Sequence, residues 1–423
     1  MGIAGIIGIV IILITVYLLI RQYETRMVLG AMGILMAVVA GKPMAAFDAF
    51  AKNIIDSGMI TAIVPVMGFA LVMKATECDK HLISLMANVM RRIRPILIPG
   101  TVMATFATNV ALPSAAGCGA AVGAIFIPLL ISSGIHPAMA ASAVLAGTAG
   151  GSALSPGNPH NPYVAKIANV DVMSVITVVS PTGIIAGGVV LAICLTIVAK
   201  FFKEDSGYEA EESMADQSSF KPNPFYAIVP IIPVSMLLLG ATGVVSALKP
   251  MGIAHTMLIG AIIGIAITRS NPSKSIKAFF DGMASGYGEI VGIIIAAGVF
   301  ISGMMAVGLV DAFLAALKDS ARIVKYAATF GPFLLAVITG SGNAAALAFN
   351  GAITPHAQQF GQEIINMGTL ASLCGSLGRT MSPVGGVVII CAAIAKVSPM
   401  ELAKRNAPGC VIAAILAMFM LLN

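Results

Sequence analysis

The stretch Gly378-Arg379-Thr380-Met381-Ser382-Pro383-Val384-Gly385-Gly386 decides how the chain folds. It separates two apolar runs, 364–377 and 387–397, each shorter than the roughly 20 helical residues that cross a bilayer. Together the runs predict one crossing that is broken in its middle. A break at that depth is tolerated only where it faces protein or a water-filled cavity, and a charge there is costly in lipid. Arg379 therefore predicts either a transport pathway or an ion-paired core position.

Two residues of this stretch suggest how the chain continues after the break. We expect Ser382 to cap the second half-helix and Pro383 to lie in its first turn, because both residue types are favoured there. The amide-rich start of a helix carries a partial positive charge. The break is thus predicted to attract an anion.

The same pattern occurs earlier in the chain, at Leu154-Ser155-Pro156-Gly157-Asn158-Pro159-His160-Asn161-Pro162. Its Ser-Pro pair lies 227 residues before Ser382-Pro383. This offset also pairs residues on either side of the break without a gap: Ser114 with Ser341, Pro128 with Pro355, Gly134 with Gly361, Gly151 with Gly378, Met173 with Met400, and Pro181 with Pro408. We interpret the pattern as an internal duplication, which is common in transporters.

Composition restricts the class of protein. The chain has 423 residues, of which 58% are hydrophobic and 10% charged, with no Trp and a mean hydropathy of +0.98. This excludes a soluble globular protein, and the continuous apolar runs predict helices rather than an alternating β-barrel. The net charge of +6 reflects basic residues that flank membrane spans, so no nucleic-acid partner is expected. The six Cys form no CxxC pair, and neither a metal site nor a cofactor is expected.

The order of apolar and polar segments predicts an all-α polytopic membrane protein built from two inverted-topology repeats. The expected boundaries are a first repeat at 1–199 (scaffold spans 1–94, hairpin and broken helix 95–199), a cytoplasmic linker at 200–224, and a second repeat at 225–423 (scaffold spans 225–325, hairpin and broken helix 326–423). Within the second repeat we expect spans at 225–247, 252–268 and 289–310, a polar segment at 269–288 and a connector at 311–325. An odd number of crossings in the first repeat inverts the second. Both termini are predicted to be periplasmic, because that orientation puts most Lys and Arg on the cytoplasmic side.

The hairpin tips and the breaks give four interrupted segments that present helix starts towards mid-membrane. With Arg379 they predict a site for a small anion. The candidate substrate-binding residues are Ser114, Ala115, Gly117, Ser155, Asn158, His160, Asn161, Ser341, Gly342, Asn343, Arg379, Thr380, Ser382 and Pro383. The coupling-ion candidates are Ser114, Gly157, Ser341, Asn343 and His160. Plainer roles stay open: the serines as helix caps, His160 as a loop histidine, and Lys166 as a snorkelling or capping residue.

The segments Thr339-Gly340-Ser341-Gly342-Asn343-Ala344 and Leu377-Gly378-Arg379-Thr380-Met381-Ser382-Pro383 resemble the anaerobic C4-dicarboxylate uptake carrier C (DcuC) family. Ser114-Ala115-Ala116-Gly117 and Leu154-Ser155-Pro156 are similar to it as well. The resemblance implies the ion-transporter superfamily fold, a homodimer with scaffold and mobile domains, elevator-type alternating access, and exchange or efflux of succinate-like dianions. The chain departs from the family in its first broken-helix loop, where Gly157-Asn158-Pro159-His160 stands in place of Thr-Ser-Gly-Asp.

These observations predict a secondary active transporter of small carboxylates in the bacterial inner membrane. C4-dicarboxylates such as succinate, fumarate, malate and aspartate are the expected substrates; another organic anion or an amino acid is the alternative. Coupling to Na⁺, coupling to H⁺ and pure exchange all stay open. A channel is disfavoured because central breaks in a duplicated chain are typical of alternating access. An enzyme is disfavoured because the sequence contains no HExxH, Walker A or GxSxG motif.

Overall fold

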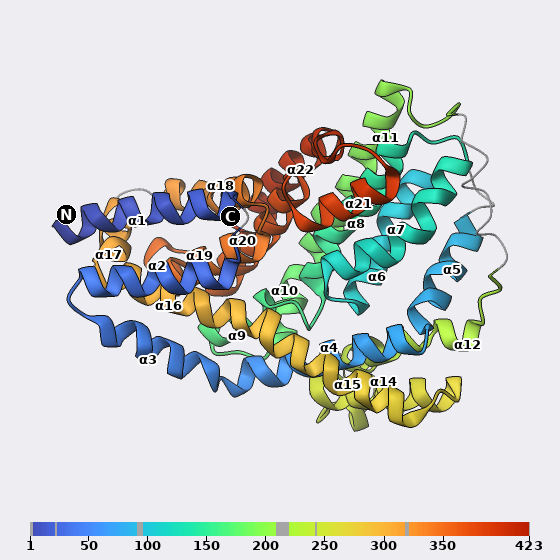
Figure 1. Cartoon of the computed structure of the whole chain (residues 1–423), viewed down its shortest axis with the longest axis horizontal. Helices are drawn as coiled ribbons and strands as arrows, with labels where there is room; N and C mark the ends of the chain where they lie inside the picture. Colours follow the sequence, from blue (N-terminus) through green and yellow to red (C-terminus); the bar gives the residue numbers. More distant parts are fainter. Residues whose placement is uncertain are drawn as a thin grey trace.

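The computed structural model describes residues 3–21, 23–90, 96–208, 220–241, 243–317 and 321–422. Every regular element among these residues is a helix, which confirms the expected all-helical fold (Figure 1). Within the described residues, six helices are long and apolar enough to cross a membrane, and shorter apolar helices of 10–17 residues accompany them. The first of the six, α1 (Ile3–Ile20), leaves most of its aliphatic side chains exposed, as a lipid-facing helix does.

Helices of the first half follow the predicted order. They are α2 (Thr25–Val39), α3 (Pro43–Ile54), α4 (Ser57–Ala75), α5 (Cys78–Met90), α6 (Leu97–Ala111), α7 (Ala115–Ser132), α8 (Pro137–Leu154), α9 (His160–Ala168), α10 (Val172–Ile184) and α11 (Leu191–Phe202). A π-helical turn, Ile185–Val190, joins α10 to α11 into one helix of 31 residues. The first predicted hairpin is α6 and α7, and the first predicted broken helix is α8 and α9.

Helices of the second half repeat this order. They are α12 (Pro224–Ala227), α13 (Ile232–Ala241), α14 (Ile253–Thr268), α15 (Pro272–Ser285), α16 (Gly292–Ala306), α17 (Leu309–Leu317), α18 (Ala321–Thr339), α19 (Gly342–Ala352), α20 (Ile364–Thr380), α21 (Gly386–Ala395) and α22 (Pro399–Leu421). The second hairpin is α18 and α19, and the second broken helix is α20 and α21.

Three expectations for the second half are wrong. The span at 225–247 is divided into α12, a 3₁₀ turn at Val229–Ile231 and α13, because its two internal prolines interrupt a regular helix. The polar segment 269–288 and the span 289–310 are one helix of 35 residues, Pro272–Ala306, joined by a π-helical turn. The connector 311–325 is largely helical, since it contains most of α17 and the start of α18.

The linker at 200–224 is shorter than expected, because α11 continues to Phe202 and α12 begins at Pro224. Its acidic residues at 209–216 lie outside the described part of the chain. After α11, Glu204 accepts a hydrogen bond from Arg405 Nε of α22 at 2.7 Å, and both side chains are about nine-tenths buried. At the other end, the Asn223 N–H donates to His81 Nδ1 of α5 at 3.0 Å. The linker is therefore anchored at both ends to helices of the main body.

Individual contacts recur at the offset of 227 residues. The Ser114 hydroxyl accepts a hydrogen bond from the Gly117 N–H at 3.1 Å, where α7 begins. The Ser341 hydroxyl accepts one from the Ala344 N–H at 3.3 Å, where α19 begins. Each hairpin tip thus starts its second arm with the same serine cap, which satisfies an otherwise unpaired amide of the first helical turn.

Close packing of hairpin against broken helix recurs as well. A Cβ on Gly151 would lie 2.4 Å from the Phe106 carbonyl oxygen, and a Cβ on Gly378 would lie 2.1 Å from the Phe333 carbonyl oxygen. No side chain fits in either place, so glycine is required where α6 crosses α8 and where α18 crosses α20. The two halves therefore agree in contacts between helices, beyond the agreement in sequence.

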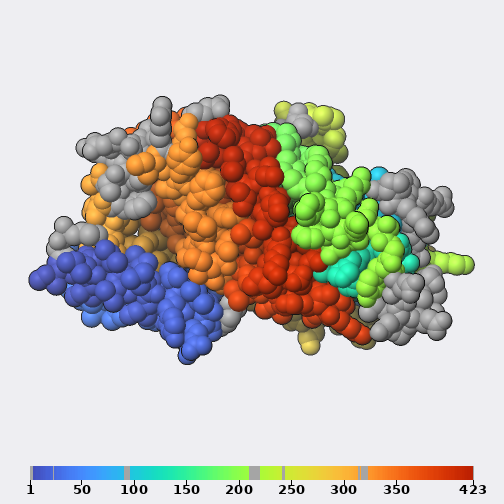
Figure 2. All heavy atoms as spheres, turned by 90° about the horizontal axis from the view of Figure 1, so that it is seen from above, coloured from blue at the N-terminus to red at the C-terminus, as the bar shows by residue number. Residues whose placement is uncertain are grey.

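The helices pack in two groups. A framework group consists of α1–α4 and α13–α16, in which α2 lies against α16 and α4 lies against α14 and α15 (Figure 1). A site group consists of α6–α11 and α18–α22, which contain both hairpins and both broken helices. Figure 2 shows α22 (red) between other helices of the second half (orange) and the end of the first half (green), so the two halves interleave in the site group. The groups meet mainly where α16 lies against α19 and α4 against α9.

Candidate functional site

Arg379 lies in the last turn of α20, immediately before the second break. The break covers 381–385, which is shorter than the predicted stretch, because Gly378, Arg379 and Thr380 are still helical. Arg379 Nη2 donates a hydrogen bond across to the Thr148 carbonyl of α8 at 3.1 Å. Thr380 is buried, and its hydroxyl donates back to the Ser376 carbonyl at 2.9 Å.

The guanidinium has no counter-ion within the described residues, since none of the ion pairs found there includes Arg379. The guanidinium instead makes its hydrogen bond to a neutral group, the Thr148 carbonyl. An interior charge without an opposite charge is strongly unfavourable. Arg379 is therefore a partly buried cation whose charge is not balanced by any described acidic residue.

The expected role of Ser382 as a cap is wrong. α21 begins four residues later at Gly386, with Gly385 as its capping residue, and Pro383 lies in the turn before it. The reason is that the Gly385 N–H bonds to the Ser382 carbonyl at 3.2 Å, which closes a turn instead of starting a helix. The Ser382 hydroxyl is fully buried and has no hydrogen-bond partner among the described residues.

Ser155 has the same environment in the first half. It follows α8, is fully buried, and its hydroxyl also lacks a partner. The Asn158 N–H bonds to the Ser155 carbonyl at 3.2 Å, as the N–H of Gly385 does to the carbonyl of Ser382. A buried hydroxyl that makes no hydrogen bond costs about 1–3 kcal/mol. Two such hydroxyls therefore lie at equivalent places of the two halves.

Each hairpin tip lies against the break of its own half. A Cβ on Gly157 would lie 3.0 Å from Pro113 Cγ, and a Cβ on Gly340 would lie 2.8 Å from the Val384 carbonyl oxygen. Gly340 has a positive φ of 73°, a conformation that glycine adopts without strain. The remaining predicted tip residues lie in the first turns of α7 and α19: Ala115, Gly117, Gly342 and Asn343.

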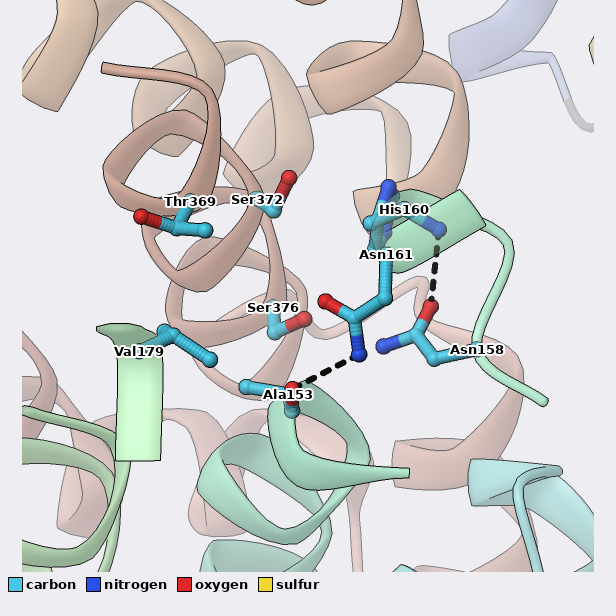
Figure 3. Close-up of a pocket in the computed structure, with 8 residues that line it drawn as sticks. All are labelled: Ala153, Asn158, His160, Asn161, Val179, Thr369, Ser372 and Ser376. Carbon is cyan, nitrogen blue, oxygen red and sulfur yellow. Dashed lines mark hydrogen bonds between the residues drawn. The ribbon is translucent and has the colours of Figure 1, made fainter. Parts of the chain in front are cut away.

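A narrow pocket opens beside the first break (Figure 3). Its walls are formed by Ala153, Asn158, His160, Asn161, Val179, Thr369, Ser372 and Ser376, which pack so closely that the space between them does not hold a water molecule. The Asn161 amide nitrogen donates to the Ala153 carbonyl at 2.8 Å and to the Ser155 carbonyl at 3.0 Å. The Asn158 side-chain oxygen accepts from the His160 N–H at 3.3 Å. These bonds fix the loop and hold its side chains towards α20.

His160 is the least satisfied polar side chain of this pocket. Only 1% of the residue is exposed, and neither ring nitrogen makes a hydrogen bond. The ring lies near the side chains of Asn343, on the hairpin tip of the second half, and Arg379. The structure therefore brings together three predicted site residues from α9, α19 and α20.

Three polar pocket residues were not predicted: Thr369, Ser372 and Ser376 of α20. Their spacing of three and four residues puts the hydroxyls on one face of the helix, and Figure 3 shows Ser376 pointing towards Asn161. A polar stripe on an otherwise apolar helix is the sequence signal that could have identified them. Lys166, by contrast, lies outside this set of residues, and its ammonium pairs with Asp56.

The fold is that of a multi-pass membrane transporter. It is similar to MtrF of Neisseria gonorrhoeae, described as one of a class of antimetabolite efflux pumps, with a TM-score of 0.65 and 15% identity over 91% of this chain and 85% of that one. It is also similar to the YdaH transporter of Alcanivorax borkumensis, with a TM-score of 0.58 and 15% identity over 99% and 97% of the two chains. At this identity the similarity concerns the fold alone.

The chain belongs to the DcuC family of C4-dicarboxylate anaerobic carriers, whose family model matches residues 3–423. A putative uncharacterized transporter of Haemophilus influenzae is 45% identical over 253 residues, which is 57% of this chain and 90% of that protein. The anaerobic C4-dicarboxylate transporter DcuC of Escherichia coli K12 is 29% identical over 229 residues, about half of each chain. The resemblance found in the tip and break motifs is thus confirmed, and the role of the family is transport rather than catalysis.

Proposed function

We propose that the chain is a secondary active carrier of small carboxylates, with C4-dicarboxylates such as succinate, fumarate, malate and aspartate as its main substrates. The observation that carries this proposal is the Arg379 guanidinium, which lies at a helix break and has no carboxylate partner among the described residues. A substrate carboxylate supplies the missing charge, and a guanidinium fork matches its two oxygens.

The neutral groups around Arg379 orient the rest of the substrate. The free hydroxyls of Ser155 and Ser382 donate hydrogen bonds to carboxylate oxygens, and His160 and the pocket of Figure 3 receive the other polar end. Another organic anion or an amino acid with a carboxylate is the alternative substrate. The hydroxyl or amino groups of such a substrate would form hydrogen bonds with the same neutral donors and acceptors.

Transport follows by alternating access of the elevator type, in which the site group moves against the framework group as a unit. The equivalent contacts in the two halves support inverted repeats, and the limited contact between the groups supports relative movement. We further propose a homodimer in the bacterial inner membrane with both termini periplasmic. Transport is by exchange or coupled to Na⁺ or H⁺, with Ser114, Gly157, Ser341, Asn343 and His160 as candidates for the coupling site.

Thermal unfolding of the purified protein with a panel of carboxylates tests the proposal. Succinate at 100 times its dissociation constant adds about 2.7 kcal/mol to the stability of the native protein. Arg379→Ala abolishes that shift, and Arg379→Lys, which keeps the charge but not the fork, leaves a reduced one. Lys404→Ala is the matched control, since Lys404 is an exposed basic residue of α22. Normal succinate affinity in Arg379→Ala would remove Arg379 from the site.

A further inference from the structure

Lys166 joins the two helix groups through an ion pair that the proposed site does not use. Its Nζ lies 2.6 Å from Asp56 Oδ2 and donates a hydrogen bond to Asn53 Oδ1 at 3.3 Å. Lys166 belongs to α9 of the site group, while Asn53 and Asp56 form the elbow between α3 and α4 of the framework group. The lysine side chain is 34% exposed and the aspartate 16%, so the pair is partly shielded from water.

The receiving end of this ion pair is rigid. The second carboxylate oxygen of Asp56 accepts from the Met59 N–H at 3.1 Å and thereby caps α4. Asn53 is packed so tightly against α16 that a Cβ on Gly298 would lie 2.3 Å from its side-chain nitrogen. Tyr287 donates its hydroxyl to the Ile54 carbonyl at 2.8 Å. The elbow between α3 and α4 is therefore held firmly against the other helices of the framework group.

The other end of the ion pair is part of the site. α9 is a half-helix of nine residues that begins at His160 and carries Asn161, both of which line the pocket of Figure 3. The first break itself also rests on the framework, since a Cβ on Gly157 would lie 2.5 Å from Val66 of α4. Holding Lys166 thus holds the pocket wall in one place relative to α4.

Among the described residues, the second half has no ion pair equivalent to that of Lys166 and Asp56. The residues 227 positions after Lys166 and Asp56 are Ala393 and Met283, neither of which carries a charge. α21, the counterpart of α9, ends in a left-handed residue as α9 does, but it packs mainly on α7, α8 and α22 and carries Ala393 at the position of Lys166. The ion pair is therefore a feature of one half and is absent from the repeated architecture.

We propose that Lys166 is a positioning residue whose ion pair with Asp56 and Asn53 latches α9 to the framework group in the conformation seen here and must open for the site to move. The proposal rests on the proposed transport function, because only a site that moves relative to the framework has to break the latch. The ion pair lowers the free energy of this conformation and therefore slows the change to the next one.

Succinate counterflow into liposomes tests the latch, with Lys166→Met, Asp56→Asn and the double variant compared with the unaltered protein. Asn at position 56 keeps the acceptor that caps α4. Each single variant raises the maximal rate of counterflow roughly threefold to tenfold and leaves KM unchanged. This range is expected for an ion pair whose contribution to stability lies between that of an exposed pair and that of a buried pair. The double variant equals the single ones, because both changes open the same pair. Unchanged or lower maximal rates, or additive effects, would overturn the latch.

Amide hydrogen exchange gives a readout that does not depend on transport. Exchange in α9 accelerates in all three variants, whereas exchange in α21 stays as in the unaltered protein. Equal protection of α9 in all four proteins would refute the latch, whatever the substrate is. Absence of succinate flux and of any succinate-induced stabilisation in the unaltered protein would instead refute the proposed substrate, and the exchange comparison would still decide the latch.

Discussion

The two pairs of equivalent serines differ in what their hydroxyls do, and this difference gives the sharpest test of the site. Ser114 and Ser341 cap helices, whereas Ser155 and Ser382 are buried without a partner. Replacing each by Ala removes the same atom from the same residue type. Ser114→Ala and Ser341→Ala each lower the free energy of unfolding by about 1 kcal/mol, the usual value of a serine cap.

Ser155→Ala and Ser382→Ala have the opposite effect on the empty protein. Each removes a hydroxyl whose burial without a partner costs about 1–3 kcal/mol, so the free energy of unfolding stays the same or rises. Ligand binding suffers instead. A hydrogen bond to a charged group contributes about 1.5–3 kcal/mol, so succinate affinity falls about tenfold to a hundredfold.

Thermal unfolding in detergent, with and without a succinate titration, separates the two outcomes. The cap variants unfold at lower temperature but bind succinate with nearly normal affinity. The break variants unfold at the normal or a higher temperature and need more succinate for the same shift. If all four variants lose stability alike and keep their succinate affinity, the free hydroxyls are not ligand positions and the reasoning is refuted.

Other predictions concern stability, measured by thermal unfolding in detergent. Gly378→Ala destabilises by about 1–3 kcal/mol or more because its Cβ would lie 2.1 Å from a carbonyl oxygen, whereas Gly30→Ala in open space is neutral or stabilising. Arg405→Ala costs about 3–5 kcal/mol because it leaves the buried Glu204 carboxylate with only His136 as a weaker partner, 3.8 Å away, whereas Lys404→Ala, which breaks an exposed pair, costs at most about 1 kcal/mol. Burial keeps the pKa of His81 below its usual value, so His81 favours folding above the unfolded pKa of about 6.5, and this contribution falls as the pH drops below that value. His81→Gln flattens that part of the stability profile.

Much of the fold could be predicted from one number, the offset of 227 residues. It paired the hairpin tips, the breaks and Gly151 with Gly378, because a duplicated chain repeats its backbone requirements, and the structure adds that both glycines lie where two helices cross. The failures occurred where local signals are ambiguous. Ser and Pro favour a helix start and a turn alike, so the sequence alone could not show that Ser382 closes a turn and leaves the helix to begin at Gly386.

Other parts of the site depend on contacts between distant segments. Ser376 of α20 comes to point towards Asn161, and Lys166 comes to pair with Asp56, only after the chain has folded (Figure 3). A hydroxyl stripe or a lone lysine has several possible partners in sequence, and tertiary packing selects one of them. The 35-residue helix Pro272–Ala306 has a similar cause, since packing of its polar first half on α4 maintains a helix that hydropathy alone divides in two.

The two breaks have equivalent backbones but carry different side chains. The backbone of both follows the same course, yet the position of Arg379 is held by Ser152 in the first half. Conversely, the positions of Asn158, His160 and Asn161 are held in the second half by one glycine and two valines. One half thus supplies the fixed charge and the other supplies neutral donors and acceptors. For the proposed carrier this division predicts that the second break binds one end of the substrate by charge and the first break selects among anions by hydrogen bonds to the other end.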